Sequence, residues 1–331
     1  MRRWIGLVLC CFLFLCGCGG PDQGGDMPLL ILRYADNQPE DYPTTAAAEY
    51  FAQLVEERTQ GKICVRLYCN GELGTENQVL EQVQFGGIDF SRISSGTLAE
   101  YYPDFEVLQL PFLYDDTEHM WRVLDGPVGE KFLTGARKAG IIGLSWFDAG
   151  ARSFYTRQPV SCLADLRGLS IRVQESEFMS RMVAQLGAVP VQIPYNDVYS
   201  AMQTAKIDGA ENNWPSYAFT GHFQAAPYFL LDEHSRLPEM QIMSTVALDR
   251  IAEIDEDYVT IIRECARECA VYERELWLQQ EADSEQQVRD YGCVVTTLSD
   301  AQLEEFRQAV RPMYEEYPED AQALIRRIRE S

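Results

Sequence analysis

Positive charge is scarce in this sequence of 331 residues. It contains 28 lysine and arginine residues against 51 aspartate and glutamate residues, and its formal net charge is −23. Proteins that bind nucleic acids concentrate lysine and arginine in patches, so this composition argues against a nucleic-acid partner. A small anionic ligand remains compatible with it, because a few arginines in a cleft can set the local field.

The motifs of common enzyme classes are also missing. The sequence has no GxSxG elbow, no HExxH motif, no Walker loop and no GxGxxG loop. Its three histidines are scattered, and no two cysteines have the CxxC spacing of a zinc site. Acidic residues are so abundant that a pair of carboxylates identifies nothing. We therefore expect a protein that is not an enzyme and that holds no metal or cofactor.

No apolar run is long enough to cross a membrane. The longest covers residues 4–15 and follows two arginines, whereas a spanning helix needs about 20 residues. This pattern predicts an export signal. The run ends in Leu15-Cys16-Gly17-Cys18, which resembles the lipobox of bacterial lipoproteins. The resemblance implies a signal peptide over residues 1–17 and a lipid on Cys18.

Residues 18–27 are predicted to form a flexible tether, because they are polar and glycine-rich and cannot bury a core. The mature protein would then lie outside the cytoplasm, attached to the membrane only through the lipid on Cys18. An ordinary secretory signal with unrelated cysteines is the alternative.

Hydrophobic periodicity predicts an α/β fold with two similar halves. In the first half, three strands alternate with two helices: strands 29–35, 63–67 and 88–93, and helices 43–60 and 76–85. The middle of the chain has a similar alternation, with strands over 141–147, 169–173 and 189–193, and helices over 175–186 and 195–206. The alternation in the first half implies a parallel sheet covered by helices, and each half should form a sheet flanked by helices.

The longest helical pattern covers residues 254–288. Its apolar stripe contains Tyr258, Ile262, Cys265, Cys269, Tyr272 and Leu276. Such a helix exceeds the needs of one lobe, so we expect it to brace both. On this stripe the two cysteines should be buried free thiols. A strand at 293–296 and helices at 300–314 and 318–330 follow.

Two arginines occupy positions suited to ligand binding. In the strand 169–173, apolar residues alternate with Ser170 and Arg172, so Arg172 projects from the face opposite the core. Arg152 follows the end of the strand 141–147, where open α/β sheets bind ligands. Periodicity alone leaves a solvated arginine as the alternative at both positions.

The segment 208–217 (DGAENNWPSY) combines hydrogen-bonding side chains with two large aromatic rings. It predicts a polar site in which Trp214 and Tyr217 give flat walls to a sugar-like ligand. The alternative is a loop whose rings cover the core.

These segments together carry a family resemblance. With the signal and lipobox, GELGTE (71–76), LRGLSIRV (166–173) and IDGAENNW (207–214) resemble the C4-dicarboxylate-type solute-binding proteins of tripartite ATP-independent periplasmic (TRAP) transporters. The resemblance covers nearly the whole mature chain. It implies a two-lobed fold like that of periplasmic binding proteins, with crossing strands, a long helix and a ligand cleft between the lobes. Lobe I would comprise residues 28–150 with about 236–265, and lobe II residues 151–235 with about 266–331.

The resemblance also implies roles for individual residues. Arg172 would grip the ligand carboxylate, for which a planar guanidinium is suited because it donates two parallel hydrogen bonds. Arg152 would be a second arginine of the site, and Asn212 would assist.

Three segments, 35–43, 148–155 and 213–217, resemble the corresponding segments of the subgroup that binds hexuronates such as glucuronate and galacturonate. Glu76, Asp148 and Asn212 would bond the sugar hydroxyls, and Trp214 or Tyr217 would cover a sugar face. We also expect the following side chains to contact the ligand: Gln38, Tyr42, Gln174 and His234. Acidic site residues fit a polyol better than a second carboxylate, so a C4-dicarboxylate is the second choice.

The resemblance implies partners: a small-molecule organic acid and the small and large membrane subunits of a TRAP permease. We expect a monomer. Two alternatives stay open at this point, a secreted hydrolase of acidic sugars and a sensory binding protein that docks on a receptor.

Overall fold

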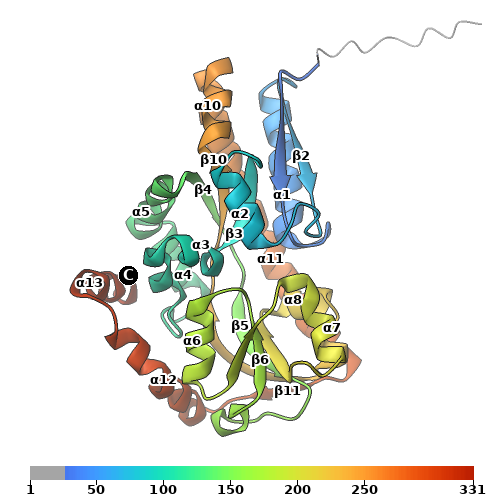
Figure 1. Cartoon of the computed structure of the whole chain (residues 1–331), viewed down its shortest axis with the longest axis vertical. Coiled ribbons are helices and arrows are strands. Elements are labelled where there is room, and N and C mark those ends of the chain that lie inside the picture. Colours follow the sequence, from blue (N-terminus) through green and yellow to red (C-terminus); the bar gives the residue numbers. More distant parts are fainter. Residues whose placement is uncertain (1–26) are drawn as a thin grey trace, which may run out of the picture.

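The computed structural model of this protein describes residues 27–331 and has two lobes, each built on one β-sheet (Figure 1). The predicted two-lobed α/β fold is confirmed. The expected signal peptide, the expected lipidation site Cys18 and all of the expected tether except Met27 lie outside the described residues. Within residues 27–331, no helix combines the length and the apolar character needed to cross a membrane.

The first lobe contains a five-stranded sheet. Its strands, in spatial order, are β2 (Ile63–Tyr68), β1 (Leu30–Ala35), β3 (Phe90–Ser94), β10 (Glu239–Ser244) and β4 (Ile141–Phe147). The first three run parallel, as their alternation with helices predicts, whereas β10 is antiparallel to both its neighbours. The helices of this lobe are α1 (Pro43–Arg58), α2 (Glu76–Gln84), α3 (Ser95–Tyr101), α4 (Thr117–Leu124), α5 (Pro127–Gly135) and α10 (Thr245–Ile254).

The second lobe contains a six-stranded sheet. Its strands, in spatial order, are β11 (Val294–Thr297), β9 (Tyr228–Arg236), β5 (Ala151–Thr156), β8 (Gly209–Asn212), β6 (Ser170–Val173) and β7 (Val189–Gln192). Its helices are α6 (Glu177–Gln185), α7 (Val198–Gln203), α8 (Trp214–Phe219) and α9 (His222–Ala225). The predicted helix 195–206 is shorter than expected, because residues 195–197 form a 3-10 turn before α7.

Two strand connections pass between the lobes. Residues 148–150 join β4 to β5, and residues 237–238 join β9 to β10. Both connections are short, so strands of the two sheets end close to the space between the lobes. The expected lobe boundaries remain a prediction.

A long helix, α11 (Glu256–Tyr291), runs along both lobes (Figure 1). Its 36 residues extend about 54 Å at about 1.5 Å per residue. It packs against α1, α10 and β4 in the first lobe and against α8 in the second. The helix begins after Asp255, whose side chain accepts a hydrogen bond from the backbone N–H of Asp257.

The buried stripe of α11 differs from the expected one in its second half. Cys265 and Cys269 are fully buried, as predicted, but Tyr272 is exposed. Glu273 and Trp277 occupy the buried face in place of Tyr272 and Leu276. The stripe changes where α11 passes residues 148–150, the connection between β4 and β5, which we call the crossing turn. There Glu273 accepts a hydrogen bond of 2.8 Å from the backbone N–H of Asp148.

The buried thiols of α11 give a first prediction. Cys269 donates a hydrogen bond to the carbonyl of Ala47 at 2.9 Å, and burial raises the pKa of its thiol well above the ordinary value. Replacing Cys265 and Cys269 with alanine should lower the free energy of unfolding by about 1–3 kcal/mol, because contacts in a packed core are lost. Urea unfolding measures this change. Ligand affinity should stay the same by calorimetry, and a tenfold loss of affinity in the folded variant would contradict a purely structural role.

The two C-terminal helices return from the second lobe to the first (Figure 1). α12 (Asp300–Glu315) packs against α6, and α13 (Glu319–Arg329) packs against the 3-10 helix over Pro103–Gln109. A ring nitrogen of His119 lies 2.7 Å from the carbonyl oxygen of Ile328 and secures this contact. The expected assignment of all residues after about 266 to lobe II therefore does not describe α13.

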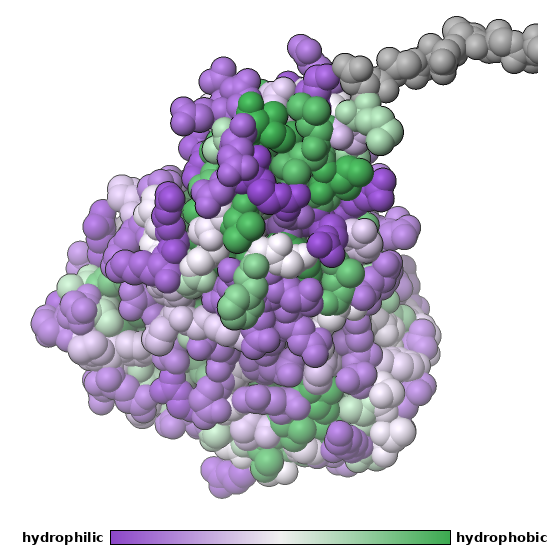
Figure 2. All heavy atoms as spheres, turned by 45° about the horizontal axis from the view of Figure 1, so that its top comes forward, coloured by the Kyte–Doolittle hydropathy of each residue, from purple (hydrophilic) through white to green (hydrophobic). Residues whose placement is uncertain are grey.

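The surface is mainly hydrophilic in the view of Figure 2, in agreement with the acidic composition. Apolar surface gathers at the end of the first lobe where β1 begins. Met27, Leu29 and Ile31 are exposed apolar side chains of this part of the chain.

Candidate functional site

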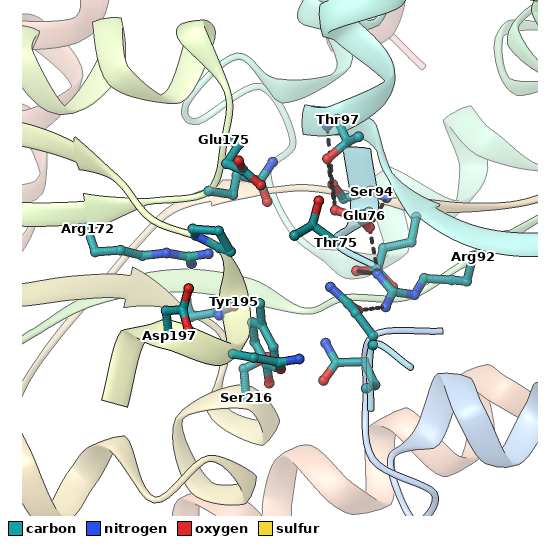
Figure 3. Close-up of a pocket in the computed structure, with 18 of the residues that line it drawn as sticks. Thr75, Glu76, Arg92, Ser94, Thr97, Arg172, Glu175, Tyr195, Asp197 and Ser216 are labelled. Atoms are coloured by element: carbon teal, nitrogen blue, oxygen red, sulfur yellow. Dashed lines mark hydrogen bonds and ion pairs between the residues drawn. The ribbon is translucent and has the colours of Figure 1, made fainter. Parts of the chain in front are cut away.

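A cavity of about 290 Å³ lies between the lobes, and polar side chains from both sheets line it (Figure 3). The first lobe contributes Gln38, Glu76, Arg92, Ser94, Thr97 and Glu239, among others. The second lobe contributes Arg152, Arg172, Gln174, Tyr195 and Asn212, among others. Six of the predicted site residues therefore meet here: Arg172, Arg152, Asn212, Glu76, Gln38 and Gln174.

Arg172 enters the cavity from β6. Ile171 and Val173 are fully buried in the core, and the alternation along the strand turns Arg172 to the other face. Its side chain is buried, and its Nε donates a hydrogen bond of 2.8 Å to the carbonyl of Ile193. Within residues 27–331 no carboxylate forms an ion pair with it. Burial and the nearby Arg152 lower its pKa, while Tyr155 and Glu211 act in the opposite direction. A buried guanidinium without an ion pair is suited to an anionic ligand.

Arg152 on β5 already has an anionic partner. Its Nε and Nη2 donate to the two carboxylate oxygens of Glu211 at 2.5 and 2.8 Å, and Nη1 donates to Asn212 Oδ1 at 2.9 Å. This pairing follows from sheet register, since β5 and β8 are adjacent and antiparallel. Burial favours a raised pKa for Glu211, but Arg152 and His234 hold its pKa at about 2.

His234 lies behind this pair rather than in the cavity lining. Its Nε2 is 3.6 Å from Glu211 Oε2, and its Nδ1 is 2.8 Å from Asp232 Oδ2. Burial lowers the pKa of His234, but Asp232 and Glu211 outweigh burial and raise it to about 9. A protonated His234 thus supports the carboxylate that orients Arg152, without lining the cavity itself.

Arg92 faces Arg172 across the cavity (Figure 3). It donates to Asp36 at 2.5 Å, to Glu76 at 2.9 Å and to Glu239 at 3.1 Å. Sequence reasoning missed both Arg92 and Glu239. The sequence did contain a signal for Arg92, because it is a charged residue at the centre of a strand, Phe90–Ser94. All residues of this strand are buried in the structure. Glu239 had no such signal, because its position beside Arg92 depends on the pairing of β10 with β3.

Several polar atoms at the cavity wall have no hydrogen-bond partner within residues 27–331: Gln38 Oε1, Gln174 Nε2 and Glu239 Oε2. Buried polar atoms are seldom left unpaired, because the cost is about 1–3 kcal/mol each. Donors and acceptors are both present in this set. A ligand with several hydroxyl groups could pair with them.

The sequence as a whole matches a known family. Residues 34–320 match the profile of the bacterial extracellular solute-binding proteins, family 7. The chain belongs to this family. It is therefore an extracytoplasmic solute-binding protein of the TRAP type, a transport component rather than a member of an enzyme family.

Solved structures of other family members are similar over nearly their whole length. A TRAP periplasmic solute-binding protein from Bradyrhizobium, in complex with galacturonate, is 39% identical with a TM-score of 0.87. The match covers 91% of this chain and 99% of that one. A protein from Chromohalobacter salexigens with bound D-glucuronate is 33% identical, with a TM-score of 0.86 and coverage of 90% and 99%. A solute-binding protein of the same organism is 34% identical over 85% of this chain and 83% of its own length.

Two aromatic residues that we expected at the ligand lie in the core of the second lobe. Trp214 stacks on Phe229 with ring centroids 3.8 Å apart, and the Tyr217 hydroxyl donates to the carbonyl of Ala226 at 2.7 Å. Neither lines the cavity. Asn213 caps the N-terminus of α8, and both rings are on the buried side of this helix. Trp214 and Tyr217 therefore cover the core, which was the alternative interpretation of the segment 208–217.

Tyr42 and Asp148 are also absent from the cavity lining. The Tyr42 hydroxyl lies 2.9 Å from Ser216 Oγ, so Tyr42 supports a lining residue from behind. Asp148 orders the crossing turn by accepting hydrogen bonds from the Gly150 N–H at 2.8 Å and from Trp121 Nε1 at 3.2 Å. Gly150 has φ of 59°, a left-handed conformation that favours glycine.

Proposed function

We propose that this protein captures a hexuronate such as glucuronate or galacturonate between its lobes and delivers it to a TRAP permease. The observation that carries the proposal is the buried Arg172, which has no carboxylate partner within residues 27–331. A carboxylate of the ligand would meet its charge with two parallel hydrogen bonds. The galacturonate and glucuronate in the similar structures support this assignment.

The opposite end of the cavity supports a polyol rather than a second carboxylate. There Asp36, Glu76 and Glu239 surround the single guanidinium of Arg92. An added anion would be repelled, whereas sugar hydroxyls can donate to carboxylates and accept from the remaining donors. A C4-dicarboxylate is therefore the second candidate ligand, favoured only by the presence of three arginines in the lining.

A thermal-shift screen of the whole mature protein against sugar acids, their neutral aldoses and dicarboxylates tests the proposal. A ligand at about 100 times its dissociation constant stabilises the folded state by roughly 2.7 kcal/mol. We expect this effect with a hexuronate and not with the neutral aldose. Recovery of the hexuronate unchanged after incubation separates binding from hydrolysis. Stabilisation by dicarboxylates alone would overturn the assignment.

The proposed location and partners follow from the same assignment. The protein would act outside the cytoplasm as a monomer and dock on the small and large permease subunits. Reconstitution of uptake with those subunits would distinguish a transport partner from a sensory receptor, which would give binding without uptake.

Cys18 is the proposed membrane anchor, on the basis of the lipobox-like LCGC ending of the signal. Replacing Cys18 with serine should release a folded protein into the soluble fraction once residues 1–17 are removed, because no apolar run after them is long enough to cross a membrane. Fractionation at high salt measures the release. A Cys18→Ser protein that stays with the membrane would refute the anchor.

A further inference from the structure

At the first-lobe end of the cavity, a single guanidinium forms ion pairs with three carboxylates. Arg92 lies at 2.5 Å from Asp36, 2.9 Å from Glu76 and 3.1 Å from Glu239, and all four side chains are largely withdrawn from water. A single positive charge cannot neutralise three buried negative charges at these distances. At least one carboxyl group of the cluster therefore gains from carrying a proton.

The hydrogen bonds identify which group that is. Glu76 accepts four: from Arg92, from the backbone N–H and hydroxyl of Ser94, and from the hydroxyl of Thr97. Asp36 accepts from Arg92 and from the backbone N–H of Gln38. Donors of this kind stabilise the charged form of a carboxyl group.

Glu239 has the poorest set of donors in the cluster. Its Oε1 accepts a hydrogen bond of 3.1 Å from Arg92, and its Oε2 is buried without a partner at the wall of the cavity. Of the three carboxyl groups, Glu239 has the fewest donors to stabilise a negative charge, so the proton belongs on Glu239. Its Oε2 is the atom that would carry the proton toward a ligand.

The wider surroundings agree with this geometry. Burial raises the pKa of Glu239 to about 8, with Glu76 and Asp36 acting in the same direction and Arg92 and Arg152 opposing them. Tyr42 and Glu273 are further titratable groups whose charge interacts with Glu239. Both are buried acids, and burial raises the pKa of each well above its ordinary value, so neither provides a positive charge that would stabilise an ionised Glu239.

We infer that Glu239 binds the sugar acid in its protonated form and donates a hydrogen bond from Oε2 to a hydroxyl or ring oxygen of the ligand. This inference rests on the proposed function and adds a residue that couples binding to pH. Ionisation of Glu239 removes the donor and places a further negative charge in the cavity that must also hold an anion. Binding therefore competes with loss of this proton.

Calorimetric titration of the full mature chain with glucuronate and galacturonate, from pH 7 to pH 9, tests the inference. If only the protonated form binds, affinity falls about tenfold over this range for a group that titrates near pH 8. Glu239→Gln keeps a neutral donor at the same place and should bind at pH 7 without this fall. His234, whose pKa is about 9, titrates in both proteins, so the difference between the two profiles isolates Glu239.

Proton uptake gives a second measurement that needs no variant. At pH 8, titrations in buffers of different ionisation enthalpy should show uptake of about half a proton per ligand bound. His234 is mostly protonated at that pH and contributes little. Uptake of no proton by the wild-type protein would overturn the inference.

Glu281 supplies a matched control. Burial beside Asp148 raises its pKa to about 7, and Glu281 does not line the cavity. Glu281→Gln should keep the wild-type profile between pH 7 and pH 9. An equal fall in the wild-type protein and in Glu239→Gln, or a loss of binding by Glu239→Gln at pH 7, would refute the role of Glu239. A wild-type protein that binds no sugar acid at any pH would instead refute the proposed function.

Discussion

Replacing Arg172 with alanine should weaken the binding of a hexuronate by about 30-fold or more. Arg172 is the buried guanidinium whose only hydrogen bond within residues 27–331 goes to a backbone carbonyl. In the complex the ligand carboxylate would lose its water, and removing Arg172 would leave it unpaired. Truncating one partner of a buried charge pair costs about 2–5 kcal/mol, and about 1.4 kcal/mol corresponds to a factor of ten. Isothermal titration calorimetry measures the effect.

Two further variants make this test specific. Arg172→Lys should recover only part of the affinity, because an ammonium group cannot reproduce the two parallel hydrogen bonds. Arg167→Ala is the matched control, since Arg167 is exposed on the turn that precedes β6 and should bind like the wild type. The carboxylate assignment fails if Arg172→Ala binds within about threefold of the wild type, or if the neutral aldose binds as well as the acid.

Replacing Glu211 with glutamine should lower the free energy of unfolding by about 3–5 kcal/mol, the usual cost of stranding a buried charge. Glu211 is fully buried and takes two hydrogen bonds from Arg152 and an ionic contact from His234. The amide would leave both cations without their shared carboxylate. Urea denaturation at neutral pH measures the loss.

The pH dependence of stability provides a second readout for Glu211. Its folded-state pKa is about 2, below the ordinary value of 4.5. A lowered pKa means that the contribution is complete above about pH 4.5 and is lost as the pH falls toward 2. The stability difference between wild type and Glu211→Gln should therefore narrow over this range.

Glu285→Gln is the control for this experiment. Glu285 pairs with Arg289 on the exposed face of α11, and such a pair contributes about 0.5 kcal/mol. A Glu211→Gln protein as stable as Glu285→Gln would contradict the structural role of the buried contacts of Glu211 with Arg152 and His234.

Local patterns in the amino-acid sequence were sufficient to predict several features of this protein. The alternation of strands and helices in the first half predicted parallel strands. A helix between two strands returns the chain to the end of the sheet where the first strand began, so the next strand runs in the same direction. The alternation Leu169-Ser170-Ile171-Arg172-Val173 predicted which way Arg172 points, since neighbouring side chains of a strand face opposite sides. The scarcity of basic residues argued against nucleic acid, and the resemblance of short segments indicated the family.

The surroundings of each charge, in contrast, depend on tertiary packing. Glu211 meets Arg152, and Glu239 meets Arg92, because strands far apart in sequence become neighbours in a sheet. The same long-range packing turns Trp214 into the core and Glu273 toward the crossing turn. A local pattern states which face of an element a side chain occupies. Whether that face meets a cavity, a counter-ion or a packed core depends on strand register and on the docking of whole elements.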